Sequence, residues 1–210
     1  MTDATPHMRC IGVYLYDWSD ALDVVGPFEV LSAWVGFAQE EADARGLPAQ
    51  EVPRLFTVAD RAGPITVGGL PIIADRTWET APRPDLLIVP GGCTVMMEDL
   101  VDAPERLRRL AESGTIIASV CTGTKLLADA GLLDGRSATT HWGYVDELAE
   151  RRPAVTVDDS ARFIDHGDVI TSAGVSAGID MALHLVQRFA GDDMARRVRR
   201  QIQYDPMPPV

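Results

Sequence analysis

Cys121 stands in a sequence context that is typical of a catalytic nucleophile. It follows the apolar run TIIASV at 115–120, and small residues flank it two positions away on either side, Ser119 and Gly123. This spacing lets a strand turn sharply into a helix, the nucleophile elbow of many hydrolases. The helix N-terminus at such a turn favours the thiolate form of cysteine. A buried structural cysteine is the common alternative for a free thiol, but the elbow spacing predicts a nucleophile.

Asp23 is the best candidate for an acidic partner of this thiol. It comes after the first strand-like run, 9–17, and shortly before Gly26-Pro27. Ligands bind beyond the carboxyl ends of the strands in a parallel sheet, so the chain after 9–17 and the chain after 115–120 should meet. Two anions cannot comfortably share such a place, so we expect one proton between them and a raised pKa for Asp23. Helix capping is the alternative role for this aspartate.

Four further residues are candidates for the same sheet edge. Gly91 and Gly92 end an apolar run, and their N–H groups suit the stabilisation of negative charge near a reacting carbon, although a plain turn also uses glycine. Thr122 offers a hydroxyl and an N–H group to a ligand, and it also suits a helix start. His141, at the end of a predicted strand 136–140, is the candidate for a substitute base.

The sequence contains no pattern for a metal or a nucleotide. The four histidines form no ligand spacing with one another or with the cysteines. The segment GVSAGID at 174–180 lacks both the Lys-Ser/Thr ending of a phosphate loop and a dinucleotide fingerprint. We therefore expect no cofactor and no metal, and we expect the small residues of 174–180 to let a helix pack closely on the sheet.

Composition restricts the class of partner. The 210 residues suit one domain, 1–210, and the net charge of −12 opposes contact with nucleic acid or an anionic membrane surface. No apolar run looks long enough to span a bilayer, and the N-terminus lacks the order of a signal peptide. Three cysteines without motif spacing suit a reducing compartment. We expect a cytoplasmic protein that binds a small molecule.

Strand-like and helical patterns alternate along the chain, which predicts an α/β fold with a mostly parallel sheet and helices on both faces. The predicted strands are 9–17, 54–59, a hairpin in 65–73 around Gly68-Gly69, 85–92, 115–120, 136–140, and two short strands joined at His166-Gly167. The predicted helices begin at Gly26-Pro27, near Pro104, at 122 (ending at Gly131), near Val145, and near 174.

These motifs resemble those of the DJ-1/PfpI superfamily. The matching stretches are ALDVVGPFEVL, DLLIVPGG, SVCTGTKLLADAGLLDGRSATTHW and TSAGVSAGIDMALHLV. Within the superfamily the combination looks most like the isonitrile hydratases, which add water to an isocyanide and form an N-substituted formamide. The resemblance implies a flavodoxin-like (Rossmann-like) sandwich, a homodimer, Cys121 as nucleophile and Asp23 as its acidic partner. The thiolate would attack the isocyanide carbon to form a thioimidate, and Asp23 would then activate water.

Other activities of the superfamily are the alternatives. Members proposed as peptidases have histidine after the nucleophile, where this chain has Thr122. Glyoxalase and stress-response members usually have glutamate in place of Asp23. Similar motifs also occur in the ligand-sensing domains of AraC-type regulators; we expect no DNA-binding domain here, because the sequence stops at Val210. Cys93, directly after the PGG motif, departs from the usual glycine-rich loop.

Overall fold

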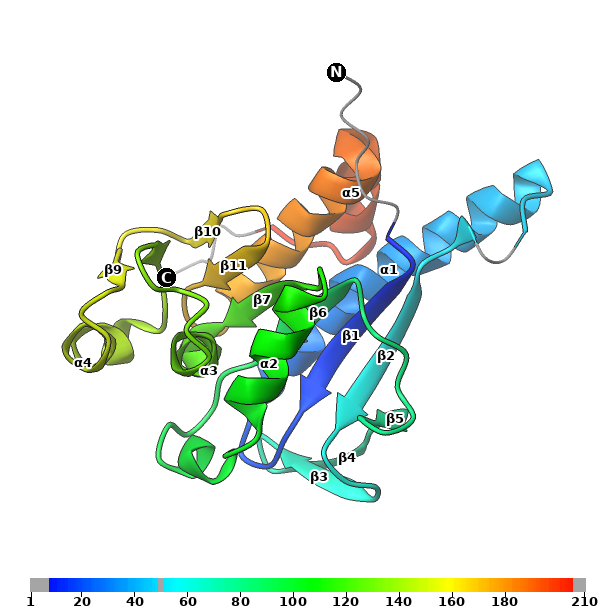
Figure 1. The fold of residues 1–210 in the computed structure, drawn as a ribbon. Helices are drawn as coiled ribbons and strands as arrows, with labels where there is room; N and C mark the ends of the chain where they lie inside the picture. Colours follow the sequence, from blue (N-terminus) through cyan, green and yellow to red (C-terminus); the bar gives the residue numbers. More distant parts are fainter. Residues whose placement is uncertain (1–7, 49–50, 206–210) are drawn as a thin grey trace.

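A seven-stranded sheet forms the centre of the molecule (Figure 1). The computed structural model describes residues 8–48 and 51–205. The strand order is β10-β11-β7-β6-β1-β2-β5, and every neighbouring pair is parallel except β10 and β11. The mostly parallel sheet is therefore confirmed. The strands are β1 (Cys10–Leu15), β2 (Arg54–Ala59), β5 (Arg76–Thr77), β6 (Leu86–Val89), β7 (Ile116–Val120), β10 (Phe163–Asp165) and β11 (Val169–Ser172).

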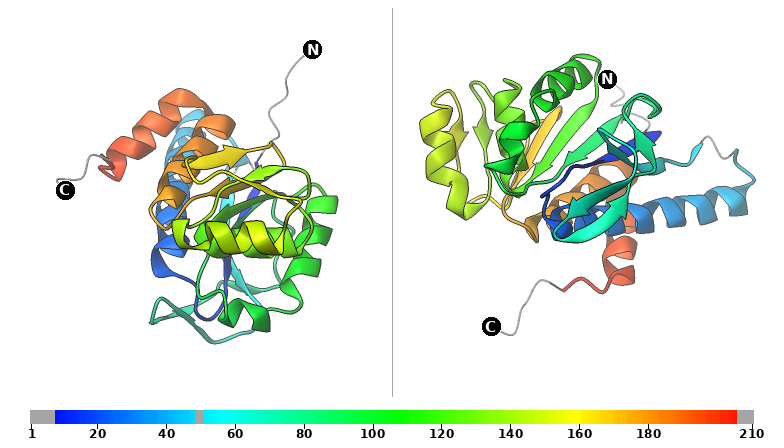
Figure 2. Two further views of the ribbon diagram at one scale, coloured as in Figure 1. Left: turned by 90° about the vertical axis from the view of Figure 1, so that its left-hand side faces the viewer. Right: turned by 90° about the horizontal axis from the view of Figure 1, so that it is seen from below.

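Helices cover both faces of the sheet. Figure 2 shows α1 (Ala21–Arg45) and α5 (Ala177–Gln201) on one side and α2 (Ala103–Glu112) on the other, with α3 (Thr124–Asp129) and α4 (Val145–Arg151). Each layer has its own apolar core. All four residues of β6 are buried, because both faces of the strand are covered. This explains why its sequence is continuously apolar instead of alternating.

The first helix begins earlier than the sequence predicted. It starts at Ala21, so Pro27 lies inside it and Asp23 lies in its first turn instead of in a loop. Proline cannot donate a backbone hydrogen bond and is usually a helix breaker. The helix continues because apolar side chains on either side of Pro27, such as Val24 and Leu31, are buried in the core, and packing of this kind outweighs local propensity.

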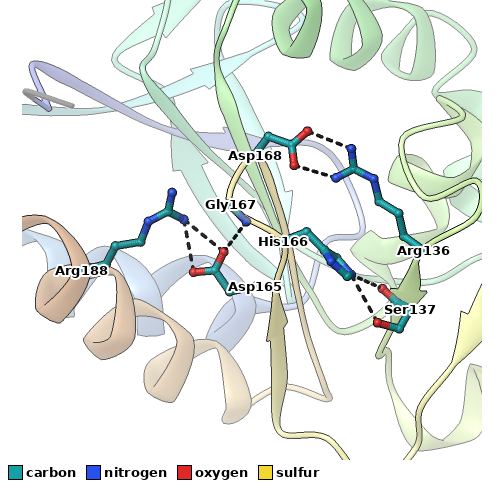
Figure 3. A network of polar contacts seen from close by, with 7 residues as sticks. All are labelled: Arg136, Ser137, Asp165, His166, Gly167, Asp168 and Arg188. Atoms are coloured by element: carbon teal, nitrogen blue, oxygen red, sulfur yellow. Dashed lines mark hydrogen bonds and ion pairs between the residues drawn. The ribbon is translucent and has the colours of Figure 1, made fainter. Parts of the chain in front are cut away.

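The two predicted hairpins are confirmed. β3 (Pro64–Val67) and β4 (Leu70–Ile73) are antiparallel around Gly68-Gly69, both with positive φ, as a two-residue hairpin turn requires. β10 and β11 pair around the turn at His166-Gly167. Figure 3 shows how this second turn is held: Asp165 accepts the N–H of Gly167 (2.7 Å) and pairs with Arg188 (3.1 Å).

The predicted strand 136–140 is shorter than expected and lies outside the central sheet. Only β8 (Ser137–Ala138) forms, and it pairs with β9 (Thr156–Val157) in a separate sheet. Side-chain contacts attach it to the β10–β11 turn instead: Arg136 forms an ion pair with Asp168 (2.6 Å), and His166 Nε2 contacts the carbonyl of Ser137 (2.8 Å) (Figure 3). The strand is therefore confirmed over residues 137–138 only, and its pairing was not predictable because neighbours in the sequence do not reveal which strand a short segment pairs with.

One expectation about membranes also needs correction. By length and composition alone, α1 is sufficiently long and apolar to span a bilayer. A core helix of a folded domain passes the same test, and the apolar residues of α1 pack against the sheet and α5. The other long helix, α5, is interrupted at Gly191, where φ is 85° and ψ is 169°.

We predict that Gly178→Ala destabilises the protein, because this glycine allows the start of α5 to approach β7 closely. A Cβ atom here would lie 2.9 Å from Cγ1 of Val120 and 3.1 Å from Cγ of Pro27. Overpacking of this kind costs about 1–3 kcal/mol. Gly36→Ala is the matched control, because nothing lies within 4 Å of a Cβ at that helical position and the change should stabilise by up to about 1 kcal/mol. Urea unfolding of both variants measures the difference; equal stabilities would contradict the close packing.

Candidate active site

Cys121 lies in a sharp turn between β7 and the short helical segment η3 (Cys121–Gly123) that leads into α3. Its φ is +58°, in the left-handed region that residues other than glycine rarely adopt. The N–H of Cys121 donates to the carbonyl of Ala173 (3.1 Å), and its own carbonyl accepts from the Thr140 hydroxyl (2.9 Å). The sharp strand-to-helix turn predicted for a nucleophile elbow is present.

The small residues around the elbow have the expected function. A Cβ atom on Gly123 would lie 2.4 Å from the carbonyl oxygen of Val89 and 2.7 Å from that of Pro90. Backbone atoms of a central strand cannot move aside, so only glycine permits this approach. Ser119 is fully buried, and its hydroxyl is 3.0 Å from that of Thr124. The elbow therefore rests directly on the end of β6.

Asp23 reaches the elbow from the first turn of α1. It is fully buried, and its Oδ2 accepts the N–H of Gly91 (2.9 Å). Its Oδ1 is buried with no hydrogen-bond partner within the described ranges. A carboxylate oxygen of Asp23, a carboxylate oxygen of Asp20 and Sγ of Cys121 all lie within 4.8 Å of one another. The structure thus brings together the predicted pair and adds a second carboxylate, which sequence reasoning missed.

Burial raises the pKa values of both members of this pair, and neighbouring carboxylates add to the effect, whereas a hydrogen bond from Cys121 lowers the pKa of Asp23. Burial raises the pKa of Asp23 to about 7, and the charge of Asp20 acts in the same direction. Burial and then the charge of Asp23 raise the pKa of the Cys121 thiol. The raised pKa of Asp23 agrees with the prediction. The expected thiolate preference of Cys121 was wrong, because the thiol is only 2% exposed and desolvation outweighs the effect of a short helical turn.

The predicted ligand-binding groups of the glycine loop are already occupied. The N–H of Gly91 is bonded to Asp23, and the N–H of Gly92 donates to the hydroxyl of Thr122 (2.8 Å), which itself donates to the Gly92 carbonyl (2.8 Å). These contacts do not support the expected donation to a substrate. A Cβ on Gly91 would lie 2.6 Å from the nitrogen of Thr122 and 2.9 Å from Oδ2 of Asp23. Gly91 instead positions Asp23, and Gly92 holds the same loop against Thr122 of the elbow.

Val175 is a site residue that the sequence did not reveal. Its backbone N–H, like that of Thr122, acts on the Cys121 sulfur and lowers the pKa of the thiol. Val175 lies between β11 and α5 with φ of +45°, which is strained for a β-branched residue. Strain of this kind often accompanies a functional constraint. The glycine at 174 hints at a turn, but no sequence signal marks a valine in this conformation.

His141 and the other two cysteines lie outside this arrangement. His141 Nδ1 accepts the N–H of Gly143 (3.2 Å), and the ring packs over Gly174, where a Cβ would be 2.6 Å from Cδ2. These contacts do not support its predicted role as a substitute base. Cys93 is exposed, and buried Cys10 receives a contact from Arg54 (3.2 Å). His7, one of the four histidines considered as metal ligands from the sequence, lies outside the described residues.

The shared proton predicts an alkylation profile for Cys121. Above pH about 7 the pair should hold one proton, shared between sulfur and carboxylate in a fixed ratio. The rate of reaction with iodoacetamide should therefore rise in a step near pH 7 and then level off. Asp23→Asn should lose this step. Peptide mass spectrometry in a Cys93→Ser background measures the rate at Cys121; a wild-type profile with no step below pH 9 would contradict the pairing.

A family model and several known proteins match this chain. The model of the DJ-1/PfpI family matches residues 11–188. The chain is 36% identical over 201 residues to the isonitrile hydratase of Pseudomonas putida, covering 95% of this chain and 80% of that protein. It is 35% identical over 149 residues to the HTH-type transcriptional regulator CdhR of Pseudomonas aeruginosa; that match covers 70% of this chain and 44% of the regulator.

Solved structures show the same architecture. A ThiJ/PfpI family protein from Pseudomonas syringae aligns with a TM-score of 0.79 and 29% identity, over 99% of this chain and 81% of that one. Drosophila melanogaster DJ-1beta aligns with a TM-score of 0.76 and 18% identity, over 94% of this chain and 99% of that one. This second likeness is evidence for the fold alone. The flavodoxin-like sandwich is confirmed. With the family match over most of its length, this chain belongs to the DJ-1/PfpI family.

Proposed function

We propose that this protein is an isonitrile hydratase, which converts small isocyanides to N-substituted formamides with Cys121 as nucleophile and Asp23 as general acid and base. The observation that carries the proposal is the buried pair itself: Cys121, which is 2% exposed in the elbow, lies beside the fully buried carboxylate of Asp23. The isonitrile hydratase relative, which matches 95% of the chain, supports the same assignment.

The burial of Cys121 favours an isocyanide over a carbonyl compound. The terminal carbon of an isocyanide has no substituent and ends a linear group, so it can approach a thiol through a narrow opening. A carbonyl carbon is surrounded by three groups in a plane and needs more space. The exposed fraction of only 2% therefore suits the slimmer electrophile.

The first half of the reaction joins sulfur to carbon. Asp23 accepts the proton of the Cys121 thiol as sulfur attacks the terminal carbon, and it then delivers that proton to the same carbon. The product is the thioimidate R–N=CH–S–Cys121. A pKa of about 7 for Asp23 suits a group that both takes and returns a proton near neutral pH. The N–H groups of Thr122 and Val175 stabilise the charge on sulfur.

The second half of the reaction adds water. Asp23 removes a proton from water as the oxygen attacks the thioimidate carbon, and it passes this proton to the substrate nitrogen. The carbon–sulfur bond then breaks as the new hydroxyl group becomes a carbonyl, its proton returns through Asp23 to the sulfur of Cys121, and the formamide R–NH–CHO leaves. Oδ1 of Asp23, which has no partner among residues 8–48 and 51–205, is the oxygen available for this proton transfer.

The wider setting follows from composition and surface. We place the protein in the cytoplasm as one domain that binds a small molecule, with neither nucleic acid nor membrane as partner, in keeping with its net charge of −12. A homodimer is supported by exposed apolar side chains on and before the first turns of α1, Trp18, Leu22 and Val25.

A ligand-sensing module is the second candidate, because the match to the regulator CdhR covers 70% of this chain. Such a module binds its ligand without consuming it. Measuring product formation distinguishes the hydratase from the ligand-sensing module. We expect formamide from a panel of alkyl and aryl isocyanides and no lactate from methylglyoxal. Lactate without formamide would support a glyoxalase instead, and binding without any product would support the sensor.

Cys121→Ala should abolish formamide production while the protein remains folded, because the change removes only a sulfur atom at the elbow. Cys93→Ser is the matched control, since this thiol is exposed and outside the site, and it should keep the wild-type rate. Product analysis and melting curves of both variants provide the test. Equal losses in the two folded variants would be incompatible with a single nucleophile.

Asp23→Asn should lower kcat by roughly a hundredfold or more, the scale of a lost general acid–base group. The same variant should be more stable at pH 8. Because the pKa of Asp23 is raised on folding, its favourable contribution is complete below pH about 4 and is lost as the pH rises to about 7. Asparagine does not ionise and therefore avoids this loss of unfolding free energy, which is about 2–4 kcal/mol at pH 8.

Asp23→Glu should retain part of the activity, limited by the misplacement of a longer carboxylate. Steady-state kinetics together with melting at pH 5 and pH 8 separate the acid–base role from a capping role. An asparagine variant with wild-type kcat would remove Asp23 from the mechanism.

A further inference from the structure

We propose that Asp20 sets the charge preference of the site, so that neutral and cationic isocyanides are accepted and those bearing a carboxylate are disfavoured. The proposal rests on the proposed hydratase function for its substrate, but it concerns a property of the site that can be measured without turnover.

Asp20 is the exposed member of a group whose other two members are buried. Its carboxylate, that of Asp23 and the Cys121 sulfur lie within 4.8 Å of one another. Asp23 is fully buried and Cys121 is 2% exposed, whereas Asp20 is exposed. Asp20 therefore marks the side on which solvent, and with it a substrate, approaches the thiol. Its position is held by its backbone N–H, which donates to the Gly91 carbonyl (2.9 Å).

The carboxylate of Asp20 is not used to hold the structure together. Asp20 is the N-cap residue of α1, where aspartate normally accepts a hydrogen bond from the first turn, yet its side chain makes no such bond. In the described part of the chain it has no ion pair either. Asp17, three residues earlier, behaves in the opposite way and pairs with Arg61 (2.8 Å). The free carboxylate of Asp20 is available to a ligand.

A second observation points to a ligand at the same place. Oδ1 of Asp23 is buried without a hydrogen-bond partner among the described residues, and Asp23 belongs to the same group of three side chains. A buried acceptor of this kind is costly unless something fills it during function. The site thus consists of an inner carboxylate that faces the reacting atoms and an outer carboxylate at the entrance.

Within residues 8–48 and 51–205, neither Asp20 nor Asp23 forms an ion pair with a basic side chain. The charges that raise the pKa of the Cys121 thiol are those of Asp23 and Asp20. The arginine near the Val175 loop, Arg162, is already paired with Asp180 (2.6 Å) and donates to the Ser176 hydroxyl (3.0 Å). The potential at the entrance is therefore negative, and it acts on any charge carried by the substrate.

The shape of an isocyanide determines where that charge lies. The group is linear, so when its carbon contacts sulfur the substituent extends back along the approach direction, past Asp20. A carboxylate on a short substituent would lie near Asp20 and be repelled, and an ammonium group would be attracted. At a separation of about 5 Å in a partly hydrated site, one unit charge changes the rate by roughly five- to tenfold.

Two alkylating reagents of nearly equal size measure this effect without catalysis. Iodoacetate is anionic and iodoacetamide is neutral, and both react with the same sulfur, so a change in the reactivity of Cys121 cancels in their rate ratio. In a Cys93→Ser background, Asp20→Asn should raise the iodoacetate-to-iodoacetamide ratio at Cys121 about fivefold. The increase should shrink in 1 M salt, because the entrance is exposed.

Glu29→Gln is the matched control. It removes the same charge from an exposed position of α1, about 13 Å further along the helix from Asp20, and should leave the ratio unchanged. An unchanged ratio in Asp20→Asn, or an equal rise in both variants, would overturn the proposal.

Steady-state kinetics extends the test to substrates. The ratio of kcat/KM for isocyanoacetate to that for a neutral alkyl isocyanide should rise about fivefold in Asp20→Asn, and the ratio for an aminoalkyl isocyanide should fall by a similar factor. If no isocyanide is hydrated, the proposed function fails while the alkylation ratio still decides the role of Asp20. If hydration proceeds and neither ratio changes, the role of Asp20 fails alone.

Discussion

The buried contact between Cys121 and Asp23 is the interaction on which the rest of the site depends. Two ionisable groups withdrawn from water cannot both carry charge, so they hold one proton between them and become a coupled pair. Desolvation stabilises the neutral forms of both groups. It raises the pKa of Asp23 to about 7 and keeps the Cys121 sulfur protonated until an electrophile arrives. The chemistry that we propose for this site is therefore proton transfer coupled to carbon–sulfur bond formation rather than attack by a permanent thiolate.

Close backbone approach makes this contact possible. Gly91 allows the loop after β6 to contact both Asp23 and Thr122, and Gly123 allows the elbow to lie against the carbonyl oxygens of Val89 and Pro90. Because these glycine N–H and carbonyl groups bond to the chain itself, the site is organised before a substrate binds. The donors left for the sulfur come from Thr122 and from the strained Val175.

The candidate site could be predicted from sequence only in part. The residues of the elbow and the acid were identifiable, because strand-to-helix turns and strand order place Cys121 and Asp23 at one sheet edge. The roles of Gly91, Gly92 and His141 were not, since a hydrogen-bond partner depends on three-dimensional positions. No sequence signal marked Asp20 or Val175 as a site residue. Both acquire significance only from what lies beside them in space.

The sequence by itself determined the architecture: continuous apolar runs predict buried parallel strands, and glycine pairs predict hairpin turns, because these signals depend on local geometry and burial. It did not determine that α1 runs through Pro27 or that β8 leaves the central sheet, since packing against distant segments decides both. Tertiary structure alone decided the protonation of the site. A pKa depends on solvent exclusion and on neighbouring charges from other segments, and only the folded chain brings Asp20, Asp23 and Cys121 within reach of one another.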